Sequence, residues 1–216
     1  MKSCVKKSTN FSKVRLVHNV ANGPIVDIFV DATKIISNFA YKTISPYLQI
    51  SSNTHVITVK IANTESIIVQ GAITFKNKFA YTLLVHGLNL TPSSILITAL
   101  EDNLSCPIPG RSHIRFFHGA SSAPAVDIYL EMTRIFTNVS YNQVGTPEYV
   151  SVPSGSVDVG ITASGKVDRI YGPLKVNLVN GGVYTVIASG LIGNTEAPLA
   201  ILVSEDTIGS CVVMNI

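Results

Sequence analysis

The chain carries the same sequence motif twice, about 100 residues apart, and this repeat limits the folds that it can adopt. Residues 14–41 (VRLVHNVANGPIVDIFVDATKIISNFAY) align with residues 114–141 (IRFFHGASSAPAVDIYLEMTRIFTNVSY), with ten identical positions out of 28. A duplication of this length indicates two copies of one folding unit. In a chain of 216 residues, the expected unit is therefore a domain of about 100 residues.

The spacing of the two copies places the domain boundaries. Glu101-Asp102 matches Glu205-Asp206 at a slightly larger offset, so the extra residues must lie in loops. We expect a first domain over 14–105, a linker over 106–112 and a second domain over 113–206. The linker sequence CPIPGRS contains two prolines, which favours a fixed orientation of the domains. A basic arm (1–13) and an uncharged apolar tail (207–216) lie outside the repeats.

Short β-type segments separated by turn residues predict the fold class. About seven such segments occur in each repeat, and residues 57–61 (ITVKI) alternate apolar with polar. Asn180-Gly181-Gly182 has the composition of a tight hairpin turn. No segment shows sustained helical periodicity. The sequence therefore predicts an all-β protein of two tandem immunoglobulin-like antiparallel β-sandwich domains, in architecture only, because the chain has no Trp.

Charged residues are scarce. They make up 13% of the chain, about half the usual 25% of soluble domains. Sheet proteins usually protect their exposed edges with charges. The chain is therefore either a monomer coated with Ser, Thr and Asn, or a subunit whose edges are covered in an assembly with itself. No apolar run approaches the roughly 20 residues that span a bilayer, so no membrane span is expected.

The charges that do occur are unevenly placed. Lys2, Lys6, Lys7 and Lys13 give the arm four positive charges and no acid. Such an arm can contact an anionic surface, or it can be a solvated terminus. The first 20 residues contain no apolar leader, which predicts intracellular synthesis and reduced cysteines, with a cell-surface location as the alternative.

The three cysteines and the tail are candidate contacts between subunits. Cys4, Cys106 and Cys211 all lie at domain boundaries, without the clustered spacing of a zinc site. They are either free thiols or crosslinks to a neighbour. The tail, with Val212, Val213, Met214 and Ile216, is suited to extended pairing with a neighbour's sheet edge, or it folds back on its own domain.

The repeated polar residues are the remaining candidates for chemistry. They are Arg15, His18 and Asp27, with their copies Arg115, His118 and Asp127. A His and an Asp at one site can be metal ligands or an acid–base pair. A duplicated motif beside a strand more often fixes the fold: Asp27 can bind turn amides or pair with Arg15, and His18 can cap a strand end. We expect the structural role, and no catalytic, cofactor or metal site.

The repeated tyrosines allow two interpretations. Tyr41/Tyr141 and Tyr81/Tyr184 can act as stacking platforms for a glycan, or as half-buried anchors with one satisfied hydroxyl. The second interpretation is the commoner in sandwiches.

The opening motif resembles a family called domain of unknown function 4397. Its members begin with a pattern close to V-R-x-x-H-A-x-x-x-A-P-x-V-D-x-Y-x-D-G, and the second repeat follows it from Ile114-Arg115 through His118 to Val126-Asp127 and Tyr129. The family's later A-Y-T-V segment and terminal E-D also occur in both repeats. The first repeat departs from the pattern at Asn19, Asn22 and Ala32.

The resemblance implies tandem immunoglobulin-like modules, as on bacterial surface proteins and in some large DNA viruses, and no enzymatic activity. Together with the low charge, it favours a non-catalytic structural protein that self-associates into an oligomer, fibre, tubule or particle layer, such as that of a large DNA virus. The alternative is an adhesion or carbohydrate-binding surface module.

Overall fold

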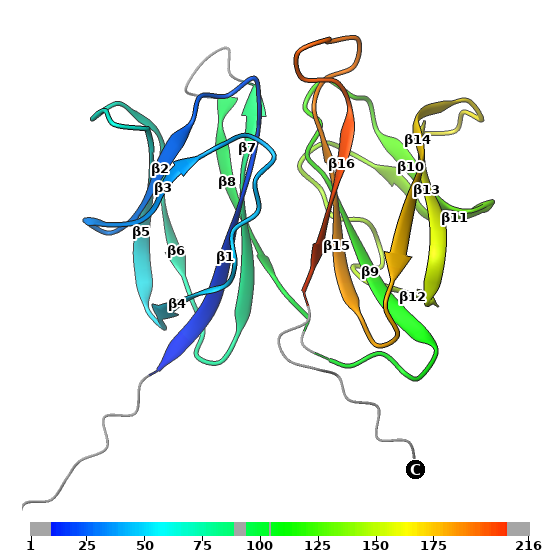
Figure 1. The fold of residues 1–216 in the computed structure, drawn as a ribbon, viewed down its shortest axis with the longest axis horizontal. Coiled ribbons are helices and arrows are strands. Elements are labelled where there is room, and N and C mark those ends of the chain that lie inside the picture. Colours follow the sequence, from blue (N-terminus) through cyan, green and yellow to red (C-terminus); the bar gives the residue numbers. More distant parts are fainter. Residues whose placement is uncertain (1–9, 89–93, 104, 207–216) are drawn as a thin grey trace, which may run out of the picture.

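The chain forms two β-sandwich domains that lie side by side (Figure 1). The computed structural model describes residues 10–88, 94–103 and 105–206. Within these ranges, no helix has the length and hydrophobicity needed to cross a membrane. The strands and sheets confirm the predicted all-β fold with two tandem sandwiches. The following residues named above lie outside the described ranges: Lys2, Cys4, Lys6, Lys7, Cys211, Val212, Val213, Met214 and Ile216.

The first domain consists of an outer sheet, ordered β3-β2-β5-β6, and an inner sheet, ordered β4-β1-β7-β8. Its strands are β1 Phe11–Ala21, β2 Val26–Val30, β3 Thr33–Phe39, β4 Leu48–Ser51, β5 Thr54–Ile61, β6 Ile67–Thr74, β7 Ala80–Leu88 and β8 Leu96–Glu101.

The second domain repeats this arrangement, with an outer sheet β11-β10-β13-β14 and an inner sheet β12-β9-β15-β16. Its strands are β9 Arg111–His118, β10 Val126–Leu130, β11 Thr133–Val139, β12 Val150–Pro153, β13 Gly155–Ala163, β14 Arg169–Leu178, β15 Val183–Ser189 and β16 Ala200–Glu205. Strands β1 and β9 therefore extend into the predicted arm and linker, and Lys13 lies in β1.

Three details differ from the predicted sandwich. Each domain has an eighth strand, β3 or β11, which pairs with its neighbour across a register shift. Each inner sheet contains one parallel pair, β1 with β7 and β9 with β15, so the sheets are not wholly antiparallel. Asn180-Gly181-Gly182 is not a hairpin turn, because β14 lies in the outer sheet and β15 in the inner sheet.

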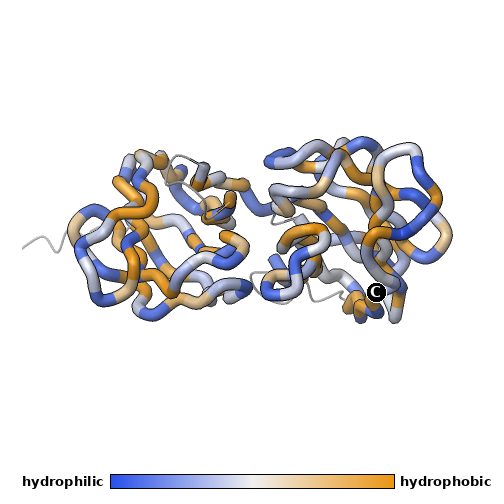
Figure 2. The backbone as a smooth tube through the Cα atoms, turned by 90° about the horizontal axis from the view of Figure 1, so that it is seen from above, coloured by the Kyte–Doolittle hydropathy of each residue, from blue (hydrophilic) through white to orange (hydrophobic). Residues whose placement is uncertain are grey.

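The central strands of the inner sheets are buried on both faces. Every residue of β7 from Ala80 to Gly87 is buried, and so is every residue of β1 from Val14 onward. In the outer sheets, β6 and β14 instead alternate between partly buried and exposed residues. Hydrophobic and hydrophilic residues accordingly alternate along much of the backbone in both domains (Figure 2).

The second buried face of the inner sheets packs against the other domain. Each sandwich has its own apolar core between its two sheets. A third apolar cluster joins Val17, Leu84 and Leu100 of the first domain to Phe117 and Ile187 of the second. The molecule is therefore a stack of four sheets, with the two inner sheets facing each other across the domain interface.

Candidate functional site

The repeated arginines cross the interface between the two domains. Arg15 on β1 and Arg115 on β9 are 3% and 0% exposed, and both project from the inner sheet away from their own core. This orientation follows from the alternation of a strand, in which Leu16 and Phe116 turn into the core. From the sequence, these arginines were expected to stabilise the fold of their own repeat. In the structure they contact the other domain instead.

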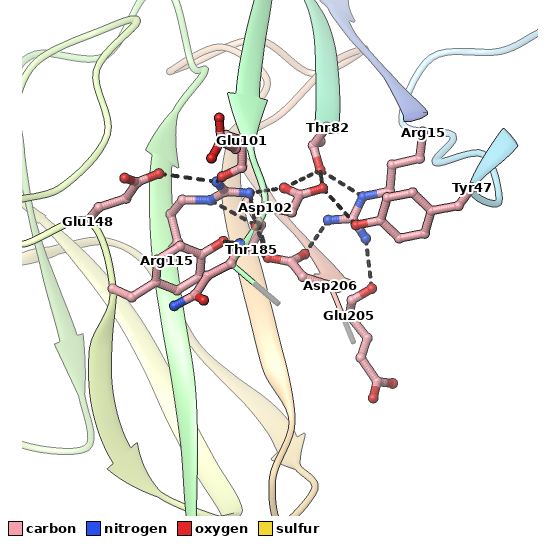
Figure 3. A network of polar contacts seen from close by, with 12 residues as sticks. Arg15, Tyr47, Thr82, Glu101, Asp102, Arg115, Glu148, Thr185, Glu205 and Asp206 are labelled. Carbon is pink, nitrogen blue, oxygen red and sulfur yellow. Dashed lines mark hydrogen bonds and ion pairs between the residues drawn. The ribbon is translucent and has the colours of Figure 1, made fainter. Parts of the chain in front are cut away.

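Each arginine binds the acidic end of the other repeat (Figure 3). The Arg15 guanidinium donates to the carbonyl oxygen of Glu205 at 2.7 Å and forms an ion pair with Asp206. The Arg115 guanidinium donates to the carbonyl oxygen of Glu101 at 2.8 Å and forms an ion pair with Asp102. The two contacts are reciprocal, so each repeat supplies one cation and one anion to the interface.

The two aspartates are held by side chains of their own domains. Asp102 accepts hydrogen bonds from Thr82 at 2.9 Å and from the Tyr47 hydroxyl at 2.7 Å. Asp206 likewise accepts from Thr185 at 2.6 Å and from the Tyr149 hydroxyl at 3.2 Å.

The same tyrosine rings also lie beside the guanidinium groups. The Arg15 guanidinium carbon is 4.8 Å from the ring centroid of Tyr47, and that of Arg115 is 4.9 Å from the ring centroid of Tyr149. Both distances suit cation–π attraction. Each arginine is therefore fixed by an aromatic ring from its own domain and an acid from the other.

The charges of this interdomain network balance. Two buried guanidinium groups meet two buried carboxylates, which is the condition for burying charge at acceptable cost. Burial raises the pKa of Asp206, while Arg15 and Arg115 act in the opposite direction. Burial lowers the pKa of Arg115, but Asp102 and Asp206 outweigh it and raise that pKa above its usual value. Burial also raises the pKa of Tyr47 and Tyr149, so both hydroxyls stay protonated and donate.

Uncharged contacts join the domains beyond the apolar cluster. The Tyr41 hydroxyl lies 3.0 Å from the Ser189 hydroxyl, and His86 Nδ1 lies 2.9 Å from the Tyr141 hydroxyl. Burial lowers the pKa of His86 to about 4, so its imidazole is neutral at pH 7.

Asn19, where the first repeat departs from the family pattern, also contributes to the interface. Its amide nitrogen donates to the carbonyl oxygen of Gly119 at 3.2 Å. A Cβ atom at Gly119 would lie 2.2 Å from that nitrogen and 2.8 Å from the carbonyl oxygen of Ala188, so the close approach favours glycine there. The two repeats have diverged at this matched position to fit one against the other.

The repeated histidines each secure the connection that follows their own strand. His18 Nε2 lies 2.9 Å from the Pro24 carbonyl oxygen, and His118 Nε2 lies 2.9 Å from that of Pro124. Burial lowers the pKa of both imidazoles.

The repeated aspartates bind the edge strands β3 and β11 and the loops after β5 and β13. Asp27 accepts from the Asn38 amide at 2.9 Å and pairs with Lys34 at 2.7 Å. Asp127 accepts from the Asn138 amide at 2.8 Å and pairs with Arg134 at 3.2 Å. The Lys34 and Asn38 contacts lower the pKa of Asp27. The suggested pair between Asp27 and Arg15 is not formed, because the two side chains belong to different sheets.

The family model of the domain of unknown function DUF4397 matches residues 12–129 and, again, residues 112–210. The chain belongs to this family. The match confirms the resemblance of the opening motif. A search of the curated proteins finds no match to the chain.

The DUF4397 motif thus combines two kinds of contact in this chain. Its His and Asp serve the loops of one repeat, while its Arg and terminal E-D connect one repeat to the next. In the described ranges, no group of three or more His, Cys, Asp or Glu is placed to hold a metal ion.

The tyrosines of the DUF4397 repeats are anchors in this structure. Tyr81 and Tyr184 are each 5% exposed, and their hydroxyls accept hydrogen bonds from the amides of Lys76 and Val179. Tyr41 and Tyr141 make the interdomain contacts given above. None of the four is left as an open stacking platform.

Cys106 differs from the expected reduced thiol. It lies exposed between β8 and β9, and its sulfur is disulfide-bonded. The other two cysteines lie outside the described ranges.

The sequence does contain a sign of the interdomain network. In a chain with few charges, an Arg near the start and an Asp near the end recur in both repeats. Tandem copies can exchange such partners, so that the Arg of one meets the Asp of the other. Tyr47 and Tyr149 carry no comparable signal, because nothing in their local sequence relates them to the arginines.

Proposed function

We propose that this protein is a non-catalytic structural subunit, built as one rigid two-domain block, that associates with copies of itself into an oligomer, fibre, tubule or particle layer such as that of a large DNA virus. The observation that carries the proposal is the reciprocal interdomain network. It uses buried charged residues of both repeats to fix the orientation of the domains. A fixed orientation is what a repeating assembly requires of its subunit, because a flexible joint would prevent a closed or regular lattice.

The contact between subunits is assigned to the open edge of the second sandwich. There the sheets part beside the unpaired sides of β11 and β12, leaving a groove with a cavity volume of about 760 Å³. Its apolar lining includes Leu130, Ile135, Val150 and Val157. Unpaired strand edges next to apolar residues are ready sites for an added strand.

The occupant that we assign to this groove is the C-terminal tail of a second copy. Ten residues follow the last described strand region, and their sequence, TIGSCVVMNI, has no charge and several β-favouring residues. Arg111 and Arg134 flank the groove, and an uncharged strand can enter between them without repulsion.

Size-exclusion chromatography with light scattering tests the proposal. We expect oligomers whose fraction increases with protein concentration, and a monomer at every concentration and salt would overturn the function. Thr133→Lys, on the groove strand β11, should reduce association, since a lysine on an edge strand opposes strand addition. Thr33→Lys at the matched position of β3 is the control and should leave association unchanged. If neither change affects an existing oligomer, the groove assignment fails while self-association stands.

A further inference from the structure

The outer sheet of the second domain contains a hollow. It has a volume of about 220 Å³ and lies over β10, β13 and β14. Its lining residues are Tyr129, Glu131, Met132, Thr162, Val167 and Arg169. Met132 and Val167 are 88% and 90% exposed, the two most exposed large apolar side chains in the described ranges. The hollow is therefore an aromatic and polar depression with an apolar rim.

The matching place in the first domain is filled by a lysine. Lys60 faces Asp27 in the strand register, as Thr162 faces Asp127, so these two residues hold equivalent positions. The Lys60 ammonium lies 4.9 Å from the ring centroid of Phe29, the equivalent of Tyr129. Replacement of this lysine by the shorter Thr162 uncovers the ring in the second repeat.

Two features of the hollow suggest that it accepts a polar ligand. Thr162 is 2% exposed, and its hydroxyl has no hydrogen-bond partner, which is costly for a buried polar atom. Arg169 lies across Gly160, where a Cβ atom would be 3.0 Å from its Nε. Its guanidinium donates to the Glu131 carbonyl oxygen at 3.3 Å and contacts no carboxylate among the described residues. Unused donors and a buried hydroxyl thus surround an open aromatic ring.

We propose that this hollow binds one neutral hexopyranose ring. The apolar C–H face of the sugar would stack on Tyr129, which offers an apolar body with a polar tip. Sugar hydroxyls both donate and accept, and they would pair with the Thr162 hydroxyl, the Arg169 guanidinium and the Glu131 carboxylate. Glu131 Oε1 already accepts from the Asp158 amide at 2.8 Å, which holds the carboxylate in place. Arg169 and Glu131 carry opposite charges, so the site favours a ligand without net charge.

Sugar binding at the hollow can be tested apart from self-association, because the hollow shares only Glu131 with the groove, and Tyr129, Thr162 and Arg169 do not line the groove. It would give a structural subunit an exposed glycan contact. A single ring of this size is expected to bind with a Kd on the order of 1 mM.

Saturation-transfer NMR on the full chain tests the proposal, with the methyl glycosides of glucose, galactose and mannose as probes. We expect saturation of the ring protons of at least one glycoside, and binding at least about tenfold weaker in Tyr129→Ala and in Arg169→Ala. Thr162→Lys should remove binding, because it restores the lysine of the first repeat. Phe29→Ala is the matched control and should bind as the wild type does.

The following outcomes would overturn the proposal: no saturation of any glycoside, equal loss of binding in Phe29→Ala and Tyr129→Ala, or saturation of adenosine in place of the glycosides. Thermal unfolding of each variant separates loss of the site from loss of the fold. Arg169 is exposed, so its removal keeps the test valid even if Thr162→Lys does not fold. Light scattering on the same samples measures the oligomeric state, so that a failure of sugar binding can be distinguished from a failure of self-association.

Discussion

The inner and outer sheets of this protein use the same kind of strand for different purposes. In the outer sheets, Asp27 and Asp127 bind loops of their own domain, and their ion-pair partners are partly exposed. In the inner sheets, Arg15 and Arg115 bind the other domain and are almost fully buried. The difference shows that one repeat unit can carry both its own fold and its connection to the next repeat.

The largest effect is expected from removing Arg115. Arg115→Ala removes the buried cation that pairs with Asp102 and leaves Arg15 as the ion-pair partner of Asp206, which should lower the free energy of unfolding by about 3–5 kcal/mol. Urea denaturation at pH 7 measures this loss. Lys76→Ala removes an ion pair whose partners are 64% and 44% exposed, and it should cost less than about 1 kcal/mol. Equal losses in the two variants would remove the distinction between buried interdomain ion pairs and exposed ones.

The apolar cluster between the domains should contribute a similar amount to the free energy of unfolding. Phe117 is fully buried and packs against the other domain, with its ring 5.2 Å from that of His86. Phe117→Ala should reduce the free energy of unfolding by about 3–5 kcal/mol, through lost contacts and a cavity. Val167→Ala on the outer surface should change it by no more than about 0.5 kcal/mol. A small effect of Phe117→Ala in urea denaturation would mean that the domains do not need each other.

His86 should make the interface sensitive to acid. Its folded pKa of about 4 lies below the usual value of 6.5, so the unfolded state binds the proton more tightly. The contribution of neutral His86 to the free energy of unfolding is therefore fully present above pH 6.5. It is lost as the pH drops toward about 4, by about 3 kcal/mol in total. His18 and His118 shift in the same direction. Urea denaturation between pH 7.5 and 4.5 should show a shallower decline in His86→Gln, and identical slopes would contradict the assignment.

The smallest effect is expected on the outer sheet of the first domain. Lys60 pairs with Glu65, which is 93% exposed, and lies over Phe29. Lys60→Ala should therefore cost about 1 kcal/mol or less in urea denaturation. A loss as large as that of Arg115→Ala would show that the outer face is as important to stability as the interface.

The repeat and its alternating segments were sufficient to predict two β-sandwiches. They were not sufficient for β3 and β11, because a register shift beside Ile28 and Ile128 interrupts the regular pairing of these strands. The hairpin expected at Asn180-Gly181-Gly182 fails for a different reason. A turn sequence fixes the local backbone, but it does not determine whether the next strand stays in the same sheet.

The interface was harder to predict, because in the sequence its residues cannot be told from residues of a domain core. Val17 and Leu84 look like ordinary core residues, and only the burial of both strand faces separates them from their neighbours. Arg15 and Asp206 are 191 residues apart, so no local spacing relates them. The hollow at Tyr129 depends on the exchange of Lys60 for Thr162, which becomes meaningful only when the strand register is known.

Differential scanning calorimetry tests the central claim most directly, because it compares the heat absorbed on unfolding with the steepness of the transition. If the inner sheets join both repeats into one cooperative unit, the chain should unfold in a single transition, with a ratio of van't Hoff to calorimetric enthalpy of about 1. Two separate transitions, or a ratio of about one half, would show two domains that unfold independently and would contradict the account.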